Sequence, residues 1–253
     1  MVRIILSGCS GKMGEAVTAC ALQNDNVEIV AGVDIYTSAL RDYPIFPAFD
    51  EISGIEADAV IDFSNPAVFE PMIDYCVKNS LPAVICTTGL SDEQKAKMNE
   101  AARSIPVFFS GNMSLGVNLM IELAKTATRV LGGSFDIEIV EQHHNRKIDA
   151  PSGTALMIAD AIKGELDKET EYAFDRTQRR EPRRKNEIGI HAVRGGTIVG
   201  EHEVIFAGND EIVKISHSAR SKSLFATGAV NAAVWLTGKQ SGLYNMSDMI
   251  SEV

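Results

Sequence analysis

Four side chains that can carry a positive charge lie within the short segment 143–147: His143, His144, Arg146 and Lys147. Histidine can gain or lose a proton near neutral pH, so it is suited to general acid–base catalysis. Lysine and arginine bind carboxylates and phosphates. The chain has a net charge of −10, so an anionic substrate would need such a local group of cations to be attracted. The segment could therefore deliver a proton and hold an anion.

The residues on either side of this segment suit the same chemistry. Residues 135–140 alternate between apolar and charged side chains as a strand does, and Pro151 ends the loop that follows. Ser152 is a good helix N-cap, and the apolar residues after Thr154 recur at helical spacing. The first backbone N–H groups of such a helix, around Gly153, favour an anion. Basic loop residues are often only solvated surface, but the order of strand, donor loop, proline and helix start favours a site.

A glycine-rich turn near the start of the chain indicates a nucleotide-binding unit. A buried strand is expected at 2–6, and the turn 8–14 carries glycines spaced G-x-x-G-x-x-G before a helix. This order opens a dinucleotide-binding βαβ unit, although the common spacing is G-x-G-x-x-G. The next strand, 27–33, is followed by Asp34, which can accept hydrogen bonds from an adenosine ribose. The acid favours a cofactor site over a plain connecting turn.

The alternation of strands and helices continues to about residue 113. Strands are expected at 59–63, 83–86 and 106–109, with helices between them. The predicted fold class is therefore α/β, with a Rossmann-like, doubly wound parallel sheet. Ligands of such sheets bind at the carboxyl ends of the strands. The residues that follow these ends, and that are expected along one cofactor groove, are Thr87, Thr88, Ser110, Gly111 and Asn112.

The pattern changes to that of antiparallel strands from residue 188 onward. Strands are expected at 188–193, 197–206 and 211–217, with hairpin turns at Gly195-Gly196 and Gly208-Asn209. They predict a second, smaller α+β domain that contains a mixed or antiparallel sheet.

Two further segments of this half carry predictions of their own. A long helix over 114–131 has an apolar stripe of Leu119, Leu123, Ala127 and Val130, which is expected to pack in the core or between subunits. The basic run 176–185 is expected to be a solvated loop.

Composition excludes several classes of protein. A pI of about 5.0 argues against a general nucleic-acid binder, which would need a basic face. No run approaches the roughly 20 apolar residues of a membrane span, and the short apolar run at the N-terminus does not resemble a signal peptide. The four cysteines form no C-x-x-C pair and have no histidine at metal-ligand spacing. Reduced thiols, no bound metal and a cytoplasmic location are therefore expected.

The donor segment also carries a specific resemblance. The string His-His-x-x-Lys-x-Asp-Ala-Pro-Ser-Gly-Thr-Ala, over residues 143–155, closely resembles the signature of the 4-hydroxy-tetrahydrodipicolinate reductases, also called dihydrodipicolinate reductases. The resemblance extends to residues 189–196 and 198–202 and to the glycine turn, and it is weakest between about 36 and 56. It departs from the family at Cys86, where glycine is common, and at 110–113, where Ala-Pro-Asn-Phe is usual.

The resemblance implies a function and the residues that perform it. The family transfers hydride from NADH or NADPH to a small cyclic dicarboxylate, the product of the preceding synthase in the diaminopimelate route to lysine. It implies that His143 is the acid, and that Lys147 holds the substrate and shares the proton transfer. His144, Ser152, Gly153 and Thr154 are implied to bind carboxylates. The implied cofactor-binding residues are Gly8, Cys9, Ser10, Gly11, Lys12, Met13, Asp34, Cys86, Thr87, Thr88, Ser110, Gly111, Asn112 and Met113.

The resemblance also implies an architecture. Residues 1–113 with 222–253 would form the dinucleotide-binding domain, because the last helix returns to the first domain. Residues 114–221 would form the domain for substrate binding and oligomerisation, with a homotetramer built through its sheet. The two crossings, near 113 and 221, would be hinges for closure.

The preferred cofactor can be predicted from the residues near the ribose acid. The charge of Asp34 would repel a 2′-phosphate, and Ile35 and Tyr36 stand where relatives that use NADPH well commonly place a basic residue. Lys12 is the one nearby cation that the sequence indicates, and it lacks the bidentate fork of arginine. NADH is therefore expected to be preferred, with measurable use of NADPH. Two alternatives remain: another nicotinamide-dependent dicarboxylate or amino-acid oxidoreductase, and a cofactor-sensing protein without turnover.

Overall fold

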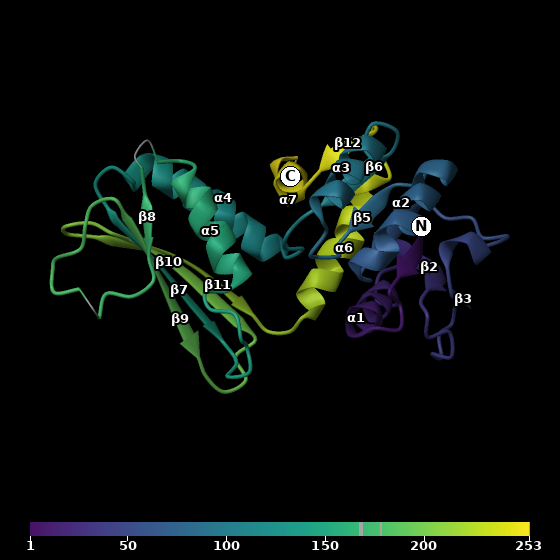
Figure 1. Cartoon of the computed structure of the whole chain (residues 1–253), viewed down its shortest axis with the longest axis horizontal. Coiled ribbons are helices and arrows are strands. Elements are labelled where there is room, and N and C mark those ends of the chain that lie inside the picture. Colours follow the sequence, from purple (N-terminus) through teal and green to yellow (C-terminus); the bar gives the residue numbers. More distant parts are fainter. Residues whose placement is uncertain (167–168, 178, 253) are drawn as a thin grey trace. The chain divides into compact units, whose positions relative to one another are not determined.

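The computed structural model describes residues 1–166, 169–177 and 179–252, which form two compact units (Figure 1). The first unit contains residues 1–115 and those from 222 onward, and the second contains residues 116–221. In the described part of the chain, no helix combines the length and the apolar character needed to cross a membrane.

The first unit is built on a parallel sheet of seven strands in the order β12-β6-β5-β4-β1-β2-β3. Its elements are β1 (Val2–Ser7), α1 (Lys12–Ala21), β2 (Val27–Val33), β3 (Ile45–Phe46), the 3-10 helix η1 (Phe49–Glu51), β4 (Ala59–Asp62), α2 (Pro66–Asn79), β5 (Ala83–Ile85), α3 (Asp92–Ala101), β6 (Pro106–Phe109), α6 (Ser223–Leu236), β12 (Gly242–Tyr244) and α7 (Met246–Ser251). The strand order reverses at β1, and this is where dinucleotides bind in such sheets.

Helices cover both faces of this sheet. Ile4 and Leu6 of β1 pack with α1 and α6 in one core cluster, whereas Ile5 packs with α2 and α3 in another. Successive strand residues point to opposite faces, so near-continuous apolar strands require cover on both sides. The prediction of a doubly wound α/β sheet is confirmed. The strands β3 and β12 were not predicted, because two or three residues give too little periodicity, and the six-residue helix α7 was not predicted either.

The second unit contains α4 (Leu115–Leu131), β7 (Asp136–His143), α5 (Gly153–Lys163), β8 (Glu171–Ala173), β9 (Glu187–Arg194), β10 (Gly200–Ala207) and β11 (Ile212–Ala219). Its sheet has the order β11-β10-β7-β9-β8 and is mixed. Strand β10 runs antiparallel to β7 and β11, whereas β9 runs parallel to β7 and β8. Apolar residues of α4 and α5 pack on one face of this sheet. The prediction of a second α+β domain with a mixed sheet is confirmed.

One of the two predicted hairpins is wrong. Strands β9 and β10 are not neighbours, because β7 lies between them, so Gly195-Gly196 is part of a connection across the sheet. Two adjacent glycines indicate a turn but do not fix which strands pair. The hairpin at Gly208-Asn209 is confirmed by the pairing of Ala207 with Ile212.

Three other sequence-based predictions need correction or restriction. His143 was placed in a loop but is the last residue of β7, where it pairs with Arg194 of β9.

The second correction concerns α4. Its residues Leu119, Leu123 and Val130 are exposed, and the core face instead carries Val117, Met120, Ile121, Ala124 and Thr128. Apolar residues occupy both faces of this helix, so the spacing of apolar residues in the sequence could not identify the buried face. The prediction that Leu119, Leu123 and Val130 pack in the core is therefore wrong, and the prediction that they pack between subunits stays a prediction.

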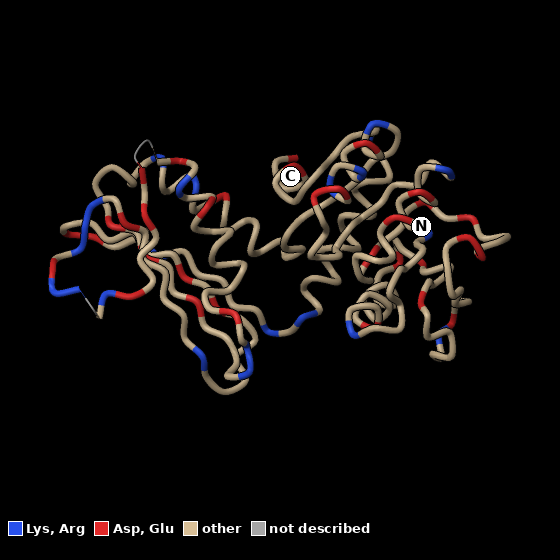
Figure 2. Tube along the Cα trace, viewed as in Figure 1, with Lys and Arg blue, Asp and Glu red and all other residues tan. Residues whose placement is uncertain are grey.

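The third correction concerns the basic run. Arg176 and Arg183 both bind the carboxylate of Glu138 at 2.8 Å, and Arg179 pairs with Glu187, whose side chain is buried. Figure 2 shows basic residues along the loop of the second unit and acidic residues on the strands of its sheet. Buried carboxylates need charged partners, so these arginines are bound to the sheet rather than solvated.

Candidate active site

The glycine turn after β1 has the conformation that a dinucleotide site requires. Gly8 has a φ of +76°, and a Cβ there would lie 2.7 Å from the carbonyl oxygen of Phe63. A Cβ at Gly14 would collide with the carbonyl of Gly8, so only glycine lets α1 start this close to the strand. Gly11 is the N-cap of α1, and Gly11 and Lys12 are exposed. The backbone is thus shaped to receive a pyrophosphate at the helix start.

Asp34 and the glycine turn are in direct contact. Asp34 follows β2, and its carboxylate accepts hydrogen bonds from the backbone N–H groups of Ser10 and Tyr36, both at 3.0 Å. The hydroxyl of Ser10 donates to the carbonyl of Tyr36 at 2.8 Å. The structure therefore places the predicted ribose acid beside the predicted pyrophosphate turn.

Lys12 is not the one cation near this turn, so that expectation is wrong. Arg41 donates from Nη2 to the carbonyl of Cys9 at 3.1 Å, and its side chain is mostly buried. Its Nη1 donates to the carbonyl of Leu40, and the carboxylate of Glu15 lies 3.9 Å away. Arg41 was missed because it lies seven residues after Asp34, outside any fixed motif spacing.

The remaining predicted cofactor residues lie at the ends of β5 and β6. Thr87 donates to the buried carboxylate of Asp62 at 2.7 Å, and the N–H of Cys86 donates to the carbonyl of Asp62. Ser110 donates to the carbonyl of Asn112 at 2.9 Å. The exposed members are Thr88 and Gly111, whereas Thr87, Asn112 and Met113 are buried. Cys9, in the glycine turn, is buried as well. The buried members shape this rim more than they present side chains to a ligand.

In the second unit, a buried carboxylate organises the donor segment. Glu141 of β7 is fully buried and accepts a hydrogen bond from Nδ1 of His143 at 2.6 Å. It also accepts two from Arg194, at 2.6 and 2.8 Å, and one from the backbone N–H of Ser152 at 3.0 Å. Burial alone would raise the pKa of Glu141, but the hydrogen bonds from Arg194, His143 and Ser152 hold that pKa below its ordinary value. Glu141 is therefore an anion that joins β7, β9 and the start of α5.

A second histidine lies against the first. The rings of His143 and His202 are 5.3 Å apart and meet edge to face. His202 is buried, and its Nε2 lies 3.1 Å from the hydroxyl of Ser152. Burial, assisted by the charge of His143, lowers the pKa of His202 to about 4. The burial of His202 and its contact with the N-cap residue of α5 indicate a structural role.

The other predicted substrate residues surround this cluster. Lys147 forms an ion pair with Asp149 at 2.9 Å and is partly exposed. His144 has a buried Nδ1 that finds no partner in the described part of the chain. Ser152 caps α5 by accepting from the N–H of Ala155, and Gly153 and Thr154 begin the helix. The hydroxyl and N–H of Ser152 are thus both engaged within the protein.

Two residues of this cluster were missed by the sequence reasoning. Glu141 lies just after the predicted strand 135–140 and was given no role, and Arg194 was assigned only to a hairpin. The signal was present, since a carboxylate two residues before a histidine lies on the same face of a strand. Arg194 could not be found this way, because only the parallel pairing of β7 and β9 brings it opposite His143.

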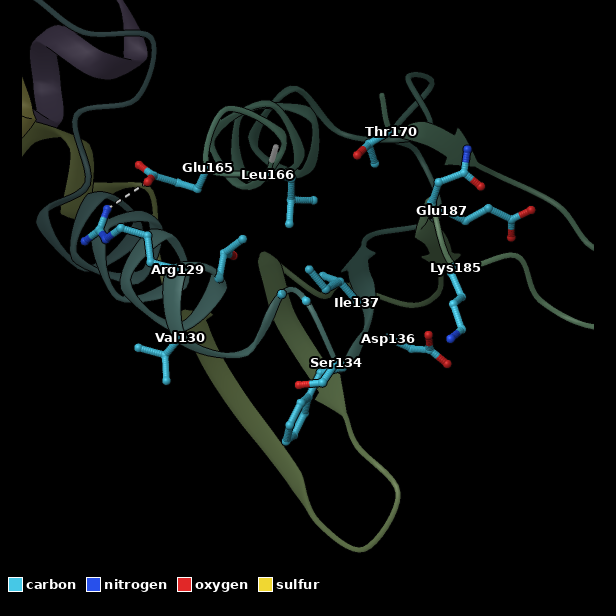
Figure 3. A pocket seen from close by; sticks show the side chains of 15 residues that line it. Arg129, Val130, Ser134, Asp136, Ile137, Glu165, Leu166, Thr170, Lys185 and Glu187 are labelled. Carbon is cyan, nitrogen blue, oxygen red and sulfur yellow. Dashed lines mark ion pairs between the residues drawn. The ribbon is translucent and has the colours of Figure 1, made fainter. Parts of the chain in front are cut away.

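A separate cavity of about 390 Å³ lies elsewhere in the second unit (Figure 3). Asp136 and Ile137, at the start of β7, line it together with Arg129, Glu165 and Lys185. Since β7 has eight residues, this end of the strand is roughly 23 Å from His143. All predicted site residues lie in the described part of the chain, and none lines this cavity.

These features define a class. A parallel sheet with a glycine turn and a ribose-side acid, joined in one chain to an α+β unit that carries a proton-donor cluster, is the architecture of a nicotinamide-dependent oxidoreductase. More particularly, the chain belongs to the dihydrodipicolinate reductase family. The family model "Dihydrodipicolinate reductase, N-terminus" matches residues 2–113, and "Dihydrodipicolinate reductase, C-terminus" matches residues 116–250.

Relatives agree along the whole chain. The 4-hydroxy-tetrahydrodipicolinate reductase of Caldanaerobacter subterraneus subsp. tengcongensis is 52% identical over 252 residues, covering 100% of this chain and 99% of that protein. The enzyme of the same name from Clostridium tetani is 47% identical over 251 residues, with 99% and 98% covered. Among solved structures, dipicolinate-bound dihydrodipicolinate reductase from Paenisporosarcina sp. TG-14 matches with a TM-score of 0.83 and 27% identity over 99% of both chains. The predicted membership of this family is thereby confirmed.

Proposed function

We propose that this chain reduces 4-hydroxy-tetrahydrodipicolinate to tetrahydrodipicolinate with NADH or NADPH, in the diaminopimelate route of lysine biosynthesis. The observation that carries the proposal is the full-length match to reductases of that name at 52% and 47% identity. Consistent with it, the glycine turn at Gly8 and the acid at Asp34 fit a dinucleotide. The bound nicotinamide supplies a hydride, and the chain supplies the binding groups and the proton.

His143 is the proposed acid, and Lys147 holds the substrate and shares the proton transfer. Hydride addition leaves an electron pair on the substrate that must be protonated, and a positioned histidine suits this step. His144, Gly153 and Thr154 are proposed to hold the carboxylates, through a helix start that favours anions. Ser152, whose N–H and hydroxyl are bound to Glu141, His202 and Ala155, is proposed to contribute by fixing that helix start. Because Lys147 is paired with Asp149 in the structure, a substrate carboxylate would have to compete with that partner.

The proposed cofactor site runs along the carboxyl ends of the first sheet. The turn from Gly8 to Met13 would hold the pyrophosphate, and Asp34 the adenosine ribose. The turns at Cys86–Thr88 and Ser110–Met113 would flank the nicotinamide. NADH is the proposed preferred cofactor because Asp34 repels a 2′-phosphate, while Lys12 and Arg41 together allow measurable use of NADPH.

The two units have different proposed roles. The first would bind the dinucleotide, the second would bind the substrate, and closure near residues 113 and 221 would complete the site. A homotetramer through the second sheet is also proposed. The exposed Leu119, Leu123 and Val130 of α4 are consistent with contacts between subunits. A cytoplasmic location is proposed because all four cysteines, which lie in the described part of the chain, are free thiols.

The test is absorbance at the reduced-nicotinamide band. The purified protein should oxidise NADH when the product of the preceding synthase is added, and not in its absence. A panel of other dicarboxylates and of amino acids should give much slower turnover. Faster turnover of another substrate would transfer the proposal to that substrate, and binding of NADH without any turnover would indicate a sensor.

A further inference from the structure

We propose that Glu141 is a positioning residue for His143: it fixes the ring so that Nε2 is the nitrogen that delivers the proton. The inference rests on the proposed function, in which His143 is the acid, and it goes beyond that function by assigning the residue that prepares this acid. Glu141 itself touches neither cofactor nor substrate in this assignment.

The argument begins with the hydrogen bonds of the carboxylate. Oε2 of Glu141 accepts from His143 at 2.6 Å and from Nη1 of Arg194 at 2.8 Å. Oε1 accepts from Nη2 of Arg194 at 2.6 Å and from the N–H of Ser152 at 3.0 Å. Both oxygens are therefore surrounded by donors, and the side chain is fully buried. A carboxylate held in this way cannot rotate without losing several charge-assisted bonds.

These bonds determine which nitrogen of His143 can react. A carboxylate flanked by an arginine only accepts, so Nδ1 of His143 must carry a proton. Nε2 is the remaining nitrogen and the only one that can give a proton to a ligand. When the charged ring donates its Nε2 proton to the substrate atom that holds the new electron pair, the ring is left neutral, with its remaining proton on Nδ1 and hydrogen-bonded to Glu141. The charge and the proton count balance, and the ring does not need to turn.

The space beside Nε2 is kept open by a glycine. A Cβ at Gly200 would lie 3.1 Å from Nε2 of His143, which is closer than a methyl group normally packs. Gly200, the first residue of β10, therefore has no side chain just where the reactive nitrogen lies. This gives a second, independent way to disturb the same nitrogen without changing any charge.

Glutamine at position 141 would reverse the pattern of donors. An amide group has one oxygen. The two donors at the Oε1 position, the N–H of Ser152 and Nη2 of Arg194, can only donate, so the oxygen should stay there. The NH₂ group would then face Nδ1 of His143, which would have to accept, and Nη1 of Arg194, which would have to turn away because it only donates. The neutral ring would carry its proton on Nε2 instead of Nδ1, as the wrong tautomer for the step above.

The chain contains a matched control on the opposite face of the same strand. Glu138 of β7 binds Nε2 of His191 at 2.6 Å and is also paired with two arginines, Arg176 and Arg183. Glu138→Gln removes the same charge from the same kind of cluster, three residues away along β7. It should leave kcat within about twofold of wild type, because His191 has no part in the proposed reaction.

The experiment combines kinetics with histidine ¹⁵N spectra of the full-length protein. Glu141→Gln should lower kcat at least about tenfold, up to the loss expected for His143→Ala, with unchanged affinity for NADH. In the His143→Ala background the same change should cause no further loss. In spectra of the neutral ring, His143 should carry its proton on Nδ1 in wild type and on Nε2 in Glu141→Gln. Gly200→Ala should lower kcat without changing NADH affinity or the tautomer.

Several outcomes would overturn the inference. One is a wild-type kcat in Glu141→Gln. Another is that Glu141→Gln lowers kcat by the same factor in wild type and in His143→Ala. A third is that His143 keeps its wild-type tautomer in a folded Glu141→Gln variant. If Glu138→Gln lowered kcat as much as Glu141→Gln does, the effect on kcat would come from the charge removed from the sheet and not from the contact with His143. If Glu141→Gln does not fold, two measurements still test the inference. A proton on Nε2 of the neutral His143 ring in wild type, or a wild-type kcat in Gly200→Ala, would contradict it. The spectra need no turnover, so a failed reductase assay with the expected tautomers would refute the proposed function alone.

Discussion

Nε2 of His202 and Oγ of Ser152 lie 3.1 Å apart, and this contact joins strand β10 to the N-cap residue of α5. Ser152 also accepts the N–H of Ala155, so its own proton is available to His202. The burial that lowers the pKa of His202 to about 4 keeps its ring neutral at neutral pH. The start of α5, which is proposed to bind a carboxylate, is thus attached to a buried neutral histidine.

The first prediction concerns stability in acid. The ordinary pKa of histidine is 6.5, and that of folded His202 is about 4. Between these values the unfolded chain binds more protons than the folded one, so the free energy of unfolding falls as the pH falls. The contribution is fully present above about pH 6.5, is lost progressively toward pH 4, and amounts to about 3 kcal/mol. Urea unfolding of wild type and His202→Gln across this range measures it.

The difference between the two proteins isolates the contribution of His202 from those of other groups. His202→Gln should show a weaker dependence of stability on pH. His191→Gln, which changes a more exposed histidine on the other face of the sheet, should keep the wild-type dependence. Identical slopes for wild type and His202→Gln would show that His202 is not held neutral by the fold.

Lys147 is the subject of the second prediction. Lys147→Ala should lower kcat and raise KM for the substrate, because the proposed role combines binding with a share of the proton transfer. Asp149→Asn is the matched variant, since it removes the partner of Lys147 and keeps the lysine. It should leave KM for the substrate equal or lower. An effect of Lys147→Ala on cofactor affinity alone would contradict the assignment.

The third prediction concerns the two nicotinamide cofactors. The ratio of kcat/KM for NADH over NADPH should exceed one in wild type and fall in Ile35→Arg, which adds a fork-shaped cation next to Asp34. Arg41→Gln should raise the ratio by weakening the use of NADPH. A wild type that strongly prefers NADPH would contradict the proposal and would identify Lys12 or Arg41 as the residue that binds the phosphate.

The fourth prediction is closure. The proposed cofactor and substrate residues lie on different units, so a complete site requires both. NADH together with a dicarboxylate analogue should protect the segments near residues 113 and 221 from hydrogen exchange, more than either ligand alone. Equal exchange in the free and doubly bound protein would indicate a rigid, preassembled site.

Much of the fold could be predicted because its signals are local. The strands at 27–33 and 106–109 were predicted from residue types and are present with these bounds. The pairing of strands was harder, because it depends on distant segments. The Gly195-Gly196 turn has the composition of a hairpin, yet β7 already occupies the position beside β9. The composition of a turn does not show that another strand already pairs with its flanking strand.

The site was predictable to a similar extent. The titratable residues of 143–147 and the N-cap at Ser152 stand in one stretch of sequence, so their types and order were enough. Arg194 and Arg41 reach their partners across 53 and 32 positions of the chain. Contacts of that kind follow from strand register and loop path, and a sequence without an alignment carries no record of them.

The most direct test of the central claim is the turnover of His143→Ala with saturating NADH and the synthase product. General acid catalysis contributes about 10²–10⁴-fold, so kcat should fall by a factor in that range. The affinity for NADH should be unchanged, since the residues proposed to hold it lie in the other unit. Wild-type turnover in this variant would contradict the assignment of His143 as the acid, and with it the mechanism proposed for this reductase.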